Sequence, residues 1–156
     1  RRWKEHSLHN PFFTFEKLEL MMNAAYLINK ESKHSPLNIS MSDIFNPSLY
    51  YGWHANYTAW DYFPKMLSFE EYVNPYLTIK RFFNYKNLWD WKKLLKTLSN
   101  YAFFSQRITN NTDDFDYISI YHYLVKLLEA VHLIDVREVN HIDGTIKNRI
   151  SKKNNY

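Results

Sequence analysis

The stretch from Asp113 to Asp135 constrains the fold more than any other part of the chain. At about 100° per residue, its apolar side chains fall on one broad helical face, which Ile118 and Val125 widen. That face holds Tyr117, Ile120, Tyr121, Leu124, Leu127, Leu128, Val131 and Ile134. Only a narrow polar strip remains opposite, with Ser119, His122, Lys126 and Glu129. Such a wide apolar arc predicts a central helix, 113–135, packed by neighbours on two sides.

Composition indicates a core built largely of aromatic side chains. The chain has 156 residues, which fits one domain of ordinary size. Aromatic residues make up 19% of it, with thirteen tyrosines and only two glycines. Because a buried tyrosine hydroxyl needs a partner, many of these rings should sit at the edges of helix contacts. We therefore expect a single compact all-α domain with an aromatic, polar-rimmed core.

Several classes of chemistry are excluded by what the chain lacks. Without cysteine it has no disulfide, thiolate metal site or cysteine nucleophile. Its two glycines, Gly52 and Gly144, do not build a phosphate-binding loop. No apolar run reaches the roughly 20 residues of a membrane span, so we expect a soluble, cytoplasmic protein that does not bind membranes. The net charge of +4 permits an acidic partner without requiring one.

Three Asn-Pro pairs predict helix starts, because asparagine caps a helix and proline suits its first turn. From Asn10-Pro11 a helix should run to about Glu31, with an apolar stripe of Phe15, Leu18, Met22, Ala25 and Tyr26. From Asn74-Pro75 a short helix should run to about Asn84, with Tyr76, Ile79 and Phe83 facing inward. After Asn46-Pro47, five aromatic residues recur at spacings of three and four and predict a third helix, which Pro64 ends. These five are Tyr50, Trp53, Tyr57, Trp60 and Phe63.

Ser68-Phe69-Glu70-Glu71 fits a capping box, in which the Ser68 hydroxyl and the Glu71 carboxylate satisfy each other's backbone amides. Leu67 and Tyr72 flank it in the positions of a hydrophobic staple. This is the most specific local signal in the chain, and it predicts a further helix start.

From Asn87, a stripe of apolar residues predicts an amphipathic surface helix. The stripe is Leu88, Trp91, Leu94, Leu95, Leu98, Tyr101 and Ala102. A polar loop, Thr109–Asp114, should follow, with Thr112 or Asp113 capping the central helix. Together these signals predict about five or six helices.

Beyond residue 135 the chain becomes polar and basic, so we expect a helical domain, 1–135, followed by an extension, 136–156. Asp143-Gly144 is typical of a tight hairpin turn, yet the flanking apolar residues fit a helix about as well. The two alternatives stay open from the sequence.

Two segments carry a resemblance to known proteins: Asn74-Pro75-Tyr76-Leu77 with Phe82-Phe83, and Tyr123–Ala130. With the leucine helix between them, they resemble uncharacterised helical proteins of Bacteroidetes over about a third of the chain. The matching residues are capping and packing residues. The resemblance implies a helical fold and no activity.

A tryptophan among cations is the strongest candidate binding surface. Trp89 projects away from the leucine stripe into an arc of lysines, preceded by further cations. An amphipathic ring in a polar surround is typical of a protein-binding hot spot, and equally of a surface that stacks bases and neutralises phosphates. A solvated lysine face is the plain alternative. The candidate partner-binding residues are Trp89, Lys92, Lys93, Lys96, Lys86 and Arg81.

Two weaker patterns point to other functions. Glu129 with His132, and Glu31 with His34, place a carboxylate and an imidazole one helical turn apart, as in di-iron bundles. Both pairs lack the further inward glutamates such a site needs. The order of helix, strand and Asp-Gly turn near the C-terminus is similar to a winged helix-turn-helix, but the central helix lacks a basic exposed face.

The sequence therefore favours a non-catalytic helical interaction module, regulatory or assembly-type, that binds another protein or itself and uses no cofactor. A nucleic-acid-binding accessory protein using the Lys/Trp face is the alternative. A di-metal helical enzyme is the third hypothesis.

Overall fold

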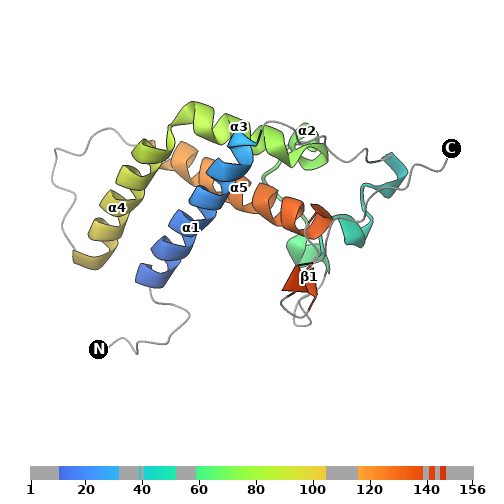
Figure 1. The fold of residues 1–156 in the computed structure, drawn as a ribbon, viewed down its shortest axis with the longest axis horizontal. Coiled ribbons are helices and arrows are strands. Elements are labelled where there is room, and N and C mark those ends of the chain that lie inside the picture. The colour runs from blue at the N-terminus through green and yellow to red at the C-terminus, as the bar shows by residue number, and fades with distance from the viewer. Residues whose placement is uncertain are drawn as a thin grey trace. The chain divides into compact units, whose positions relative to one another are not determined.

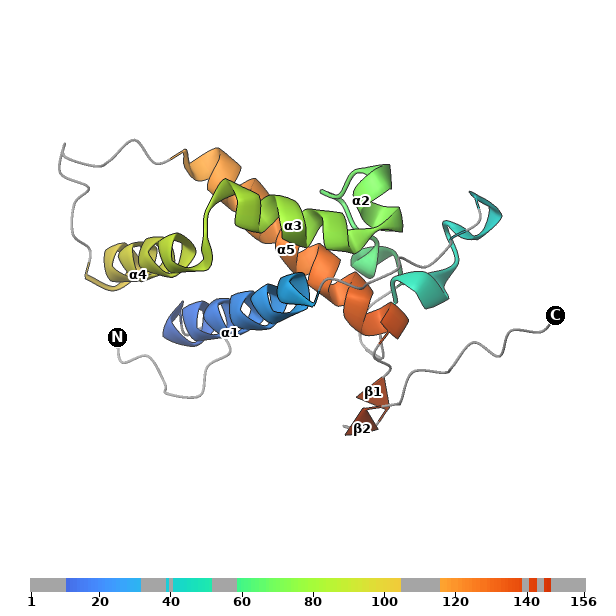
Figure 2. The same ribbon diagram turned by 45° about the horizontal axis from the view of Figure 1, so that its top comes forward.

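The computed structural model describes residues 11–31, 39, 41–51, 59–104, 116–138, 141–142 and 145–146. Within them lie five α-helices, so the predicted all-α architecture is confirmed (Figures 1 and 2). Their bounds are α1 Pro11–Lys30, α2 Phe69–Val73, α3 Pro75–Tyr85, α4 Leu88–Phe104 and α5 Tyr117–Glu138. Three short 3-10 turns cover Met41–Asp43, Pro47–Leu49 and Ala59–Tyr62.

Near the C-terminus the hairpin alternative is the one observed. Strand β1, His141–Ile142, pairs antiparallel with β2, Thr145–Ile146, so that His141 faces Ile146 and Ile142 faces Thr145. Asp143 and Gly144, for which the sequence predicts a tight turn, lie outside the described residues.

Contacts divide the chain into two compact units. The first comprises Arg1–His34 and Ile79–Tyr123, and the second Ser35–Thr78 and Leu124–Tyr156. The unit boundaries fall inside α3 and α5, whereas the boundary expected from the sequence lies at residue 135. Helix α5 continues past that residue to Glu138. A separate C-terminal extension, 136–156, stays a prediction.

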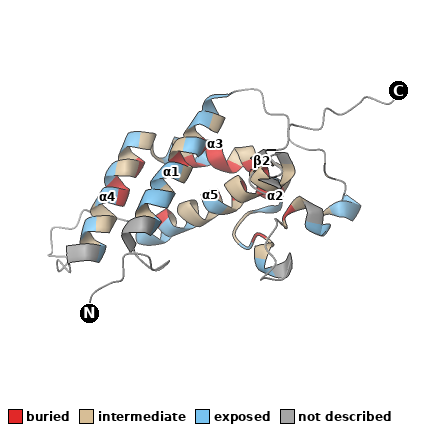
Figure 3. Cartoon of the chain, turned by 60° about the horizontal axis from the view of Figure 1, so that its bottom comes forward, coloured by how far each residue is buried: buried red, intermediate tan, exposed pale blue. Residues whose placement is uncertain are grey.

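The first unit has its core where α1, α3 and α4 meet, and the predicted stripes of α1 and α4 point into it. Trp91, Phe82 and Met22 are fully buried there, and Figure 3 shows buried positions in red on α3 and α4. The Trp91 and Phe82 rings stack with centroids 4.2 Å apart, and the indole N–H donates to the Phe82 carbonyl oxygen at 3.1 Å. Phe82 is thus the central apolar residue of α3, whereas the sequence pattern favoured Phe83, which is only partly buried.

The second unit is built around Tyr50, Tyr72 and Leu133, with partly buried aromatic and aliphatic residues packed against them. Its strongest local feature is the predicted capping box. The Ser68 hydroxyl accepts from the Glu71 amide, and the Glu71 carboxylate accepts from the Ser68 amide at 2.9 Å. Leu67 packs against the cluster that contains Tyr72, as the staple predicts. Ser68 is therefore the N-cap of α2.

The predicted helix from Pro47 to Phe63 is wrong in the described part of that range. Pro47–Leu49 and Ala59–Tyr62 are 3-10 turns, while Trp53 and Tyr57 lie outside the described residues. The aromatic side chains find partners without a helix: Phe63 packs edge-on against Tyr50, with ring centroids 5.0 Å apart. Contacts with the unit's core, rather than helical periodicity, explain the spacing of these rings.

Helix α5 begins four residues later than expected from the sequence. Asp116 caps it, accepting from the Ser119 amide at 3.0 Å, while Thr112 and Asp113 lie outside the described residues. Its first turns are less enclosed than predicted, because Ile118 is 71% exposed and Tyr121 61% exposed. The predicted burial of those residues, and of the exposed Tyr117 and Leu128, is wrong.

The polar strip of α5 contributes contacts that the sequence did not indicate. Lys126 donates to the buried Glu71 carboxylate at 2.8 Å, and Glu129 accepts from the backbone of residues 65–67. On the apolar side, Leu127, Ala130 and Leu133 are completely buried. The C-terminal half of α5 is therefore packed on both its apolar and its polar side. No helix in the described part of the chain has the length and apolarity needed to cross a bilayer.

Candidate binding surface on helix α4

Local structure at the start of α4 sets the direction of Trp89. The Asn87 side chain accepts from the Asp90 amide at 2.9 Å and donates to the Asp90 carboxylate at 2.6 Å, which fixes the first turn. Trp91 faces the core of the first unit. A residue two positions away lies about 200° around the helix. Trp89 is accordingly 69% exposed, and its predicted outward position is confirmed.

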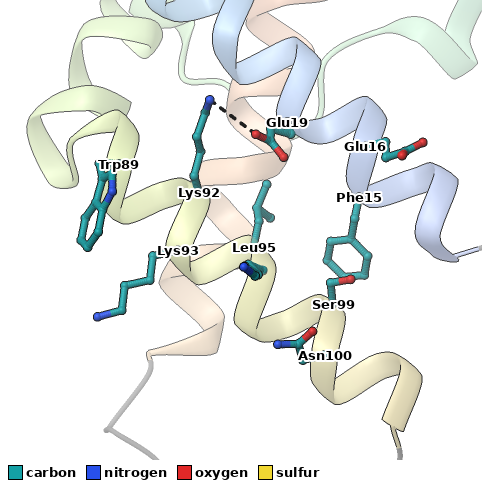
Figure 4. A pocket seen from close by; sticks show the side chains of 10 residues that line it. Phe15, Glu16, Glu19, Trp89, Lys92, Lys93, Leu95, Ser99 and Asn100 are labelled. Atoms are coloured by element: carbon teal, nitrogen blue, oxygen red, sulfur yellow. Dashed lines mark ion pairs between the residues drawn. The ribbon is translucent and has the colours of Figure 1, made fainter.

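A hollow of about 710 Å³ lies beside Trp89, between α1 and α4 (Figure 4). Its apolar lining residues are Leu95, which is buried, and Phe15, which is partly buried. Lysines of α4 line one side, and Glu16 and Glu19 come from α1. The Lys92 ammonium lies 3.4 Å from the Glu19 carboxylate, joining the two helices. The hollow is therefore amphipathic, with cations on one edge and carboxylates on the other.

Lys93 extends the cationic edge. Its ammonium lies 5.6 Å from the centroid of the Trp89 ring, within cation–π range. Figure 4 shows the Trp89 and Lys93 side chains pointing away from α1, whereas Lys92 reaches toward Glu19. Lys93 and Lys96 are both exposed, and neither has a carboxylate partner in the described part of the chain. Among the described residues, two positive charges without a carboxylate partner thus lie along one side of the hollow.

A second hollow, of about 520 Å³, shares Trp89 and Lys92 with the first. Its aromatic wall is Tyr26 and Phe83, whose rings meet edge to face with centroids 5.4 Å apart. Asparagine amides supply most of its polar lining. Trp89 therefore stands on the rim of two adjoining depressions.

The structure brings together four of the six predicted binding residues: Trp89, Lys92, Lys93 and Lys96 line the larger hollow. Lys86 and Arg81 line neither hollow. The Lys86 ammonium instead lies 5.1 Å from the Tyr85 ring centroid, and Tyr85 stacks on Tyr123. The role of Lys86 and Arg81 in binding stays a prediction.

Sequence reasoning missed the contribution of α1 to this surface. Phe15 belonged to the predicted apolar stripe of that helix, but Glu16 and Glu19 carried no signal that they would face a lysine of α4. Their approach depends on the packing of α1 beside α4, which brings together residues more than 70 positions apart.

The carboxylate–histidine pair of α5 is engaged elsewhere. Glu129 accepts hydrogen bonds from three backbone amides, and His132 Nε2 lies 2.9 Å from the Tyr50 carbonyl oxygen. His34, from the other pair, lies outside the described residues. Over the described ranges, no group of three His, Asp or Glu side chains is arranged to hold a metal ion. Glu129 and His132 thus both contact the backbone of other segments of the second unit.

Comparison with protein-family models, with curated proteins and with solved structures gave no match. The resemblance to helical proteins of Bacteroidetes therefore stays a prediction.

Proposed function

We propose that this protein is a non-catalytic interaction module, regulatory or assembly-type, that binds another protein through the Trp89 surface, defined as Trp89, Lys92, Lys93 and Lys96 with the hollow beside them. The observation that carries the proposal is the exposure of Trp89 on the rim of two hollows, on a helix whose other face is buried. An exposed indole combines a large apolar body with a polar N–H, and tryptophan is enriched at protein interfaces for that reason.

The energetics of protein interfaces support this use of Trp89. Binding energy concentrates in a few aromatic and arginine anchors, around which less important contacts exclude water. Trp89 has the features of such an anchor, with lysine stems and ammonium groups forming a polar rim. The cap at Asn87 holds the start of α4 in place, so little backbone entropy is lost there on binding.

The test is retention of a natural protein partner. We expect the wild-type chain to hold one when purified gently from cells that express it, and Trp89→Ala to release it. Tyr121→Ala is the matched control, because it removes an aromatic ring of similar exposure, 61%, from α5. A partner retained by Trp89→Ala, or released equally by Tyr121→Ala, would contradict the proposal.

A nucleic acid is the second candidate, favoured by the lysines around an exposed ring. Against it stand Glu16 and Glu19, which line the same hollow and would repel phosphates. Nucleic-acid binding through these lysines should weaken steeply between about 50 and 200 mM salt, because counterions are released. Single-stranded DNA and RNA of mixed sequence, titrated at both salt concentrations, test this; salt-insensitive or absent binding would remove the candidate.

A further inference from the structure

We propose that the hollow between α1 and α4 receives one amphipathic helix of the partner protein, about three turns long, with an apolar ridge and an acidic edge that lies along α4. This inference rests on the proposed function, because it names the chemistry of the segment that binds at Trp89. It is carried by the spacing, the charges and the apolar surface of the hollow, which point to the same occupant.

The spacing on α4 suits a helix. The residues that line the larger hollow from α4 occur at intervals of three or four, so they form one continuous stripe along the helix. They are Trp89, Lys92, Lys93, Leu95, Lys96, Ser99 and Asn100. From Trp89 to Asn100 the helix rises about 17 Å, the length of about three turns of a second helix. An occupant lying along the groove would meet this whole stripe.

The charged residues beside the hollow determine which charges the partner helix should carry along its two edges. Lys93 and Lys96 are exposed and without carboxylate partners among the described residues, so a carboxylate placed beside them gains attraction without breaking an existing ion pair. Lys92 is already compensated by Glu19. On the α1 side, Glu16 is exposed and would repel acid. The partner helix should therefore be acidic along one edge and neutral or basic along the other.

The apolar lining of the hollow is the reason why we propose an apolar ridge on the partner helix. Phe15, which is partly exposed, offers carbon surface beside the charged edges, and the exposed Trp89 ring adds more at one end, whereas Leu95 lines the hollow but is buried. Leucine, isoleucine or methionine side chains at intervals of three and four would cover this surface, as in other helix-in-groove complexes. A single-stranded nucleic acid fits less well, because its phosphates would meet Glu16 and Glu19.

Three synthetic helical peptides of about fifteen residues serve as probes. All carry the same leucine ridge and glutamine along one edge; the other edge is glutamate in the first, glutamine in the second and lysine in the third. Because the peptides are free to reverse direction in the groove, each can place its charged edge on either side. We expect the glutamate peptide to bind the wild-type chain at least tenfold more tightly than the glutamine peptide, by fluorescence anisotropy at low salt.

The reciprocal variant is Lys93→Glu with Lys96→Glu. Both side chains are exposed, and circular dichroism would confirm that the variant is folded. We expect it to bind the glutamate peptide at least tenfold more weakly, to bind the glutamine peptide unchanged, and to bind the lysine peptide more tightly than the wild type does. Lys65→Glu with Lys80→Glu is the control, because it makes the same change in net charge at exposed residues that line neither hollow.

The outcomes separate this inference from the proposed function. If Trp89→Ala releases the natural partner but the glutamate peptide binds wild type no better than the glutamine peptide, the acidic helix is wrong and the protein-binding surface stands. Equal losses in both double variants would mean that net charge alone attracts the peptide, which also overturns the inference. So would displacement of the peptide by single-stranded DNA at matched charge, or a dimer of the chain that Lys93→Glu with Lys96→Glu dissociates.

Discussion

The indole of Trp91 both stacks on the Phe82 ring and donates its N–H to the Phe82 carbonyl oxygen, so one side chain joins α4 to α3 through an apolar and a polar contact. Trp91→Ala should lower the free energy of unfolding by about 3–5 kcal/mol, the usual cost of truncating a buried aromatic residue. Trp89→Ala, two positions away and exposed, should change it by about 0.5 kcal/mol or less. Urea denaturation of both variants measures the contrast, and comparable losses would contradict the assignment of faces on α4.

Glu129 fastens the segment before α2 to α5. Its carboxylate accepts from the amides of Lys65 at 2.8 Å, Met66 at 3.0 Å and Leu67 at 3.1 Å. Glu129→Gln removes the charge and one acceptor oxygen, so we expect a loss of about 2 kcal/mol and faster hydrogen exchange at those three amides. Glu16→Gln is the control, because Glu16 is exposed and takes no part in this contact. Unchanged exchange at residues 65–67 in Glu129→Gln would show that other contacts hold the segment.

Tyr72 should make stability fall at high pH. Burial raises the pKa of its hydroxyl, although the neighbouring Arg137 guanidinium acts in the opposite direction. Its contribution is fully present below the pKa of an unfolded tyrosine, about 10, and is lost as the pH rises toward the folded value, because the unfolded chain gives up this proton first. Wild type should therefore lose more stability than Tyr72→Phe between pH 8 and pH 10.5, as urea midpoints would show.

The same variant has a separate effect at neutral pH. The Tyr72 hydroxyl donates to the Ile44 carbonyl oxygen at 2.8 Å, so Tyr72→Phe leaves that oxygen without this donor and should cost about 1–3 kcal/mol. A variant as stable as wild type at pH 7 would mean that water replaces the hydroxyl there.

Asp116 should titrate below its ordinary range. Hydrogen bonds from the Ser119 hydroxyl and then the Ser119 amide lower the pKa of its carboxyl, because both favour the charged form. Its contribution to helix stability is present above the unfolded value of about 3.9 and is lost as the pH falls through the lower folded pKa. Ser119→Ala should move the Asp116 midpoint upward in a carboxyl NMR titration. An unmoved midpoint would show that the hydroxyl is not responsible.

Local signals predicted the parts of the fold that depend on neighbours in sequence. The Ser68–Glu71 box, the buried stripes of α1 and α4 and the outward Trp89 depend on spacings of two to four residues, and the structure confirms them. The predictions that failed concern residues whose contact partners lie far away in the sequence. Aromatic spacing after Pro47 is helical, but Tyr50 and Phe63 pack against the second unit's own core, and their backbone is not α-helical.

The prediction for the polar residues of α5 failed for the same reason. Lys126 and Glu129 fell on a strip expected to face water, yet their partners are Glu71 and the amides of residues 65–67, more than 50 positions away. Nothing in helical periodicity distinguishes a solvated carboxylate from one that binds distant amides. At the candidate surface, too, local sequence patterns predicted the residues that α4 contributes, but they did not predict that Glu16 and Glu19 of α1 would line the same hollow.

The hydrogen bonds from the amides of residues 65–67 to the Glu129 carboxylate have a consequence for which substitutions this chain tolerates. Because the Glu129 carboxylate accepts from main-chain amides, many amino acids should be tolerated at positions 65 and 66, except proline, which has no amide hydrogen to donate. Position 67 is more restricted, because the Leu67 side chain packs against the core cluster of the second unit. At position 129 we expect few amino acids other than glutamate to be tolerated, because both carboxylate oxygens accept hydrogen bonds. In a saturation library selected for folding, we expect diversity at 65 and 66 beside near-uniform glutamate at 129.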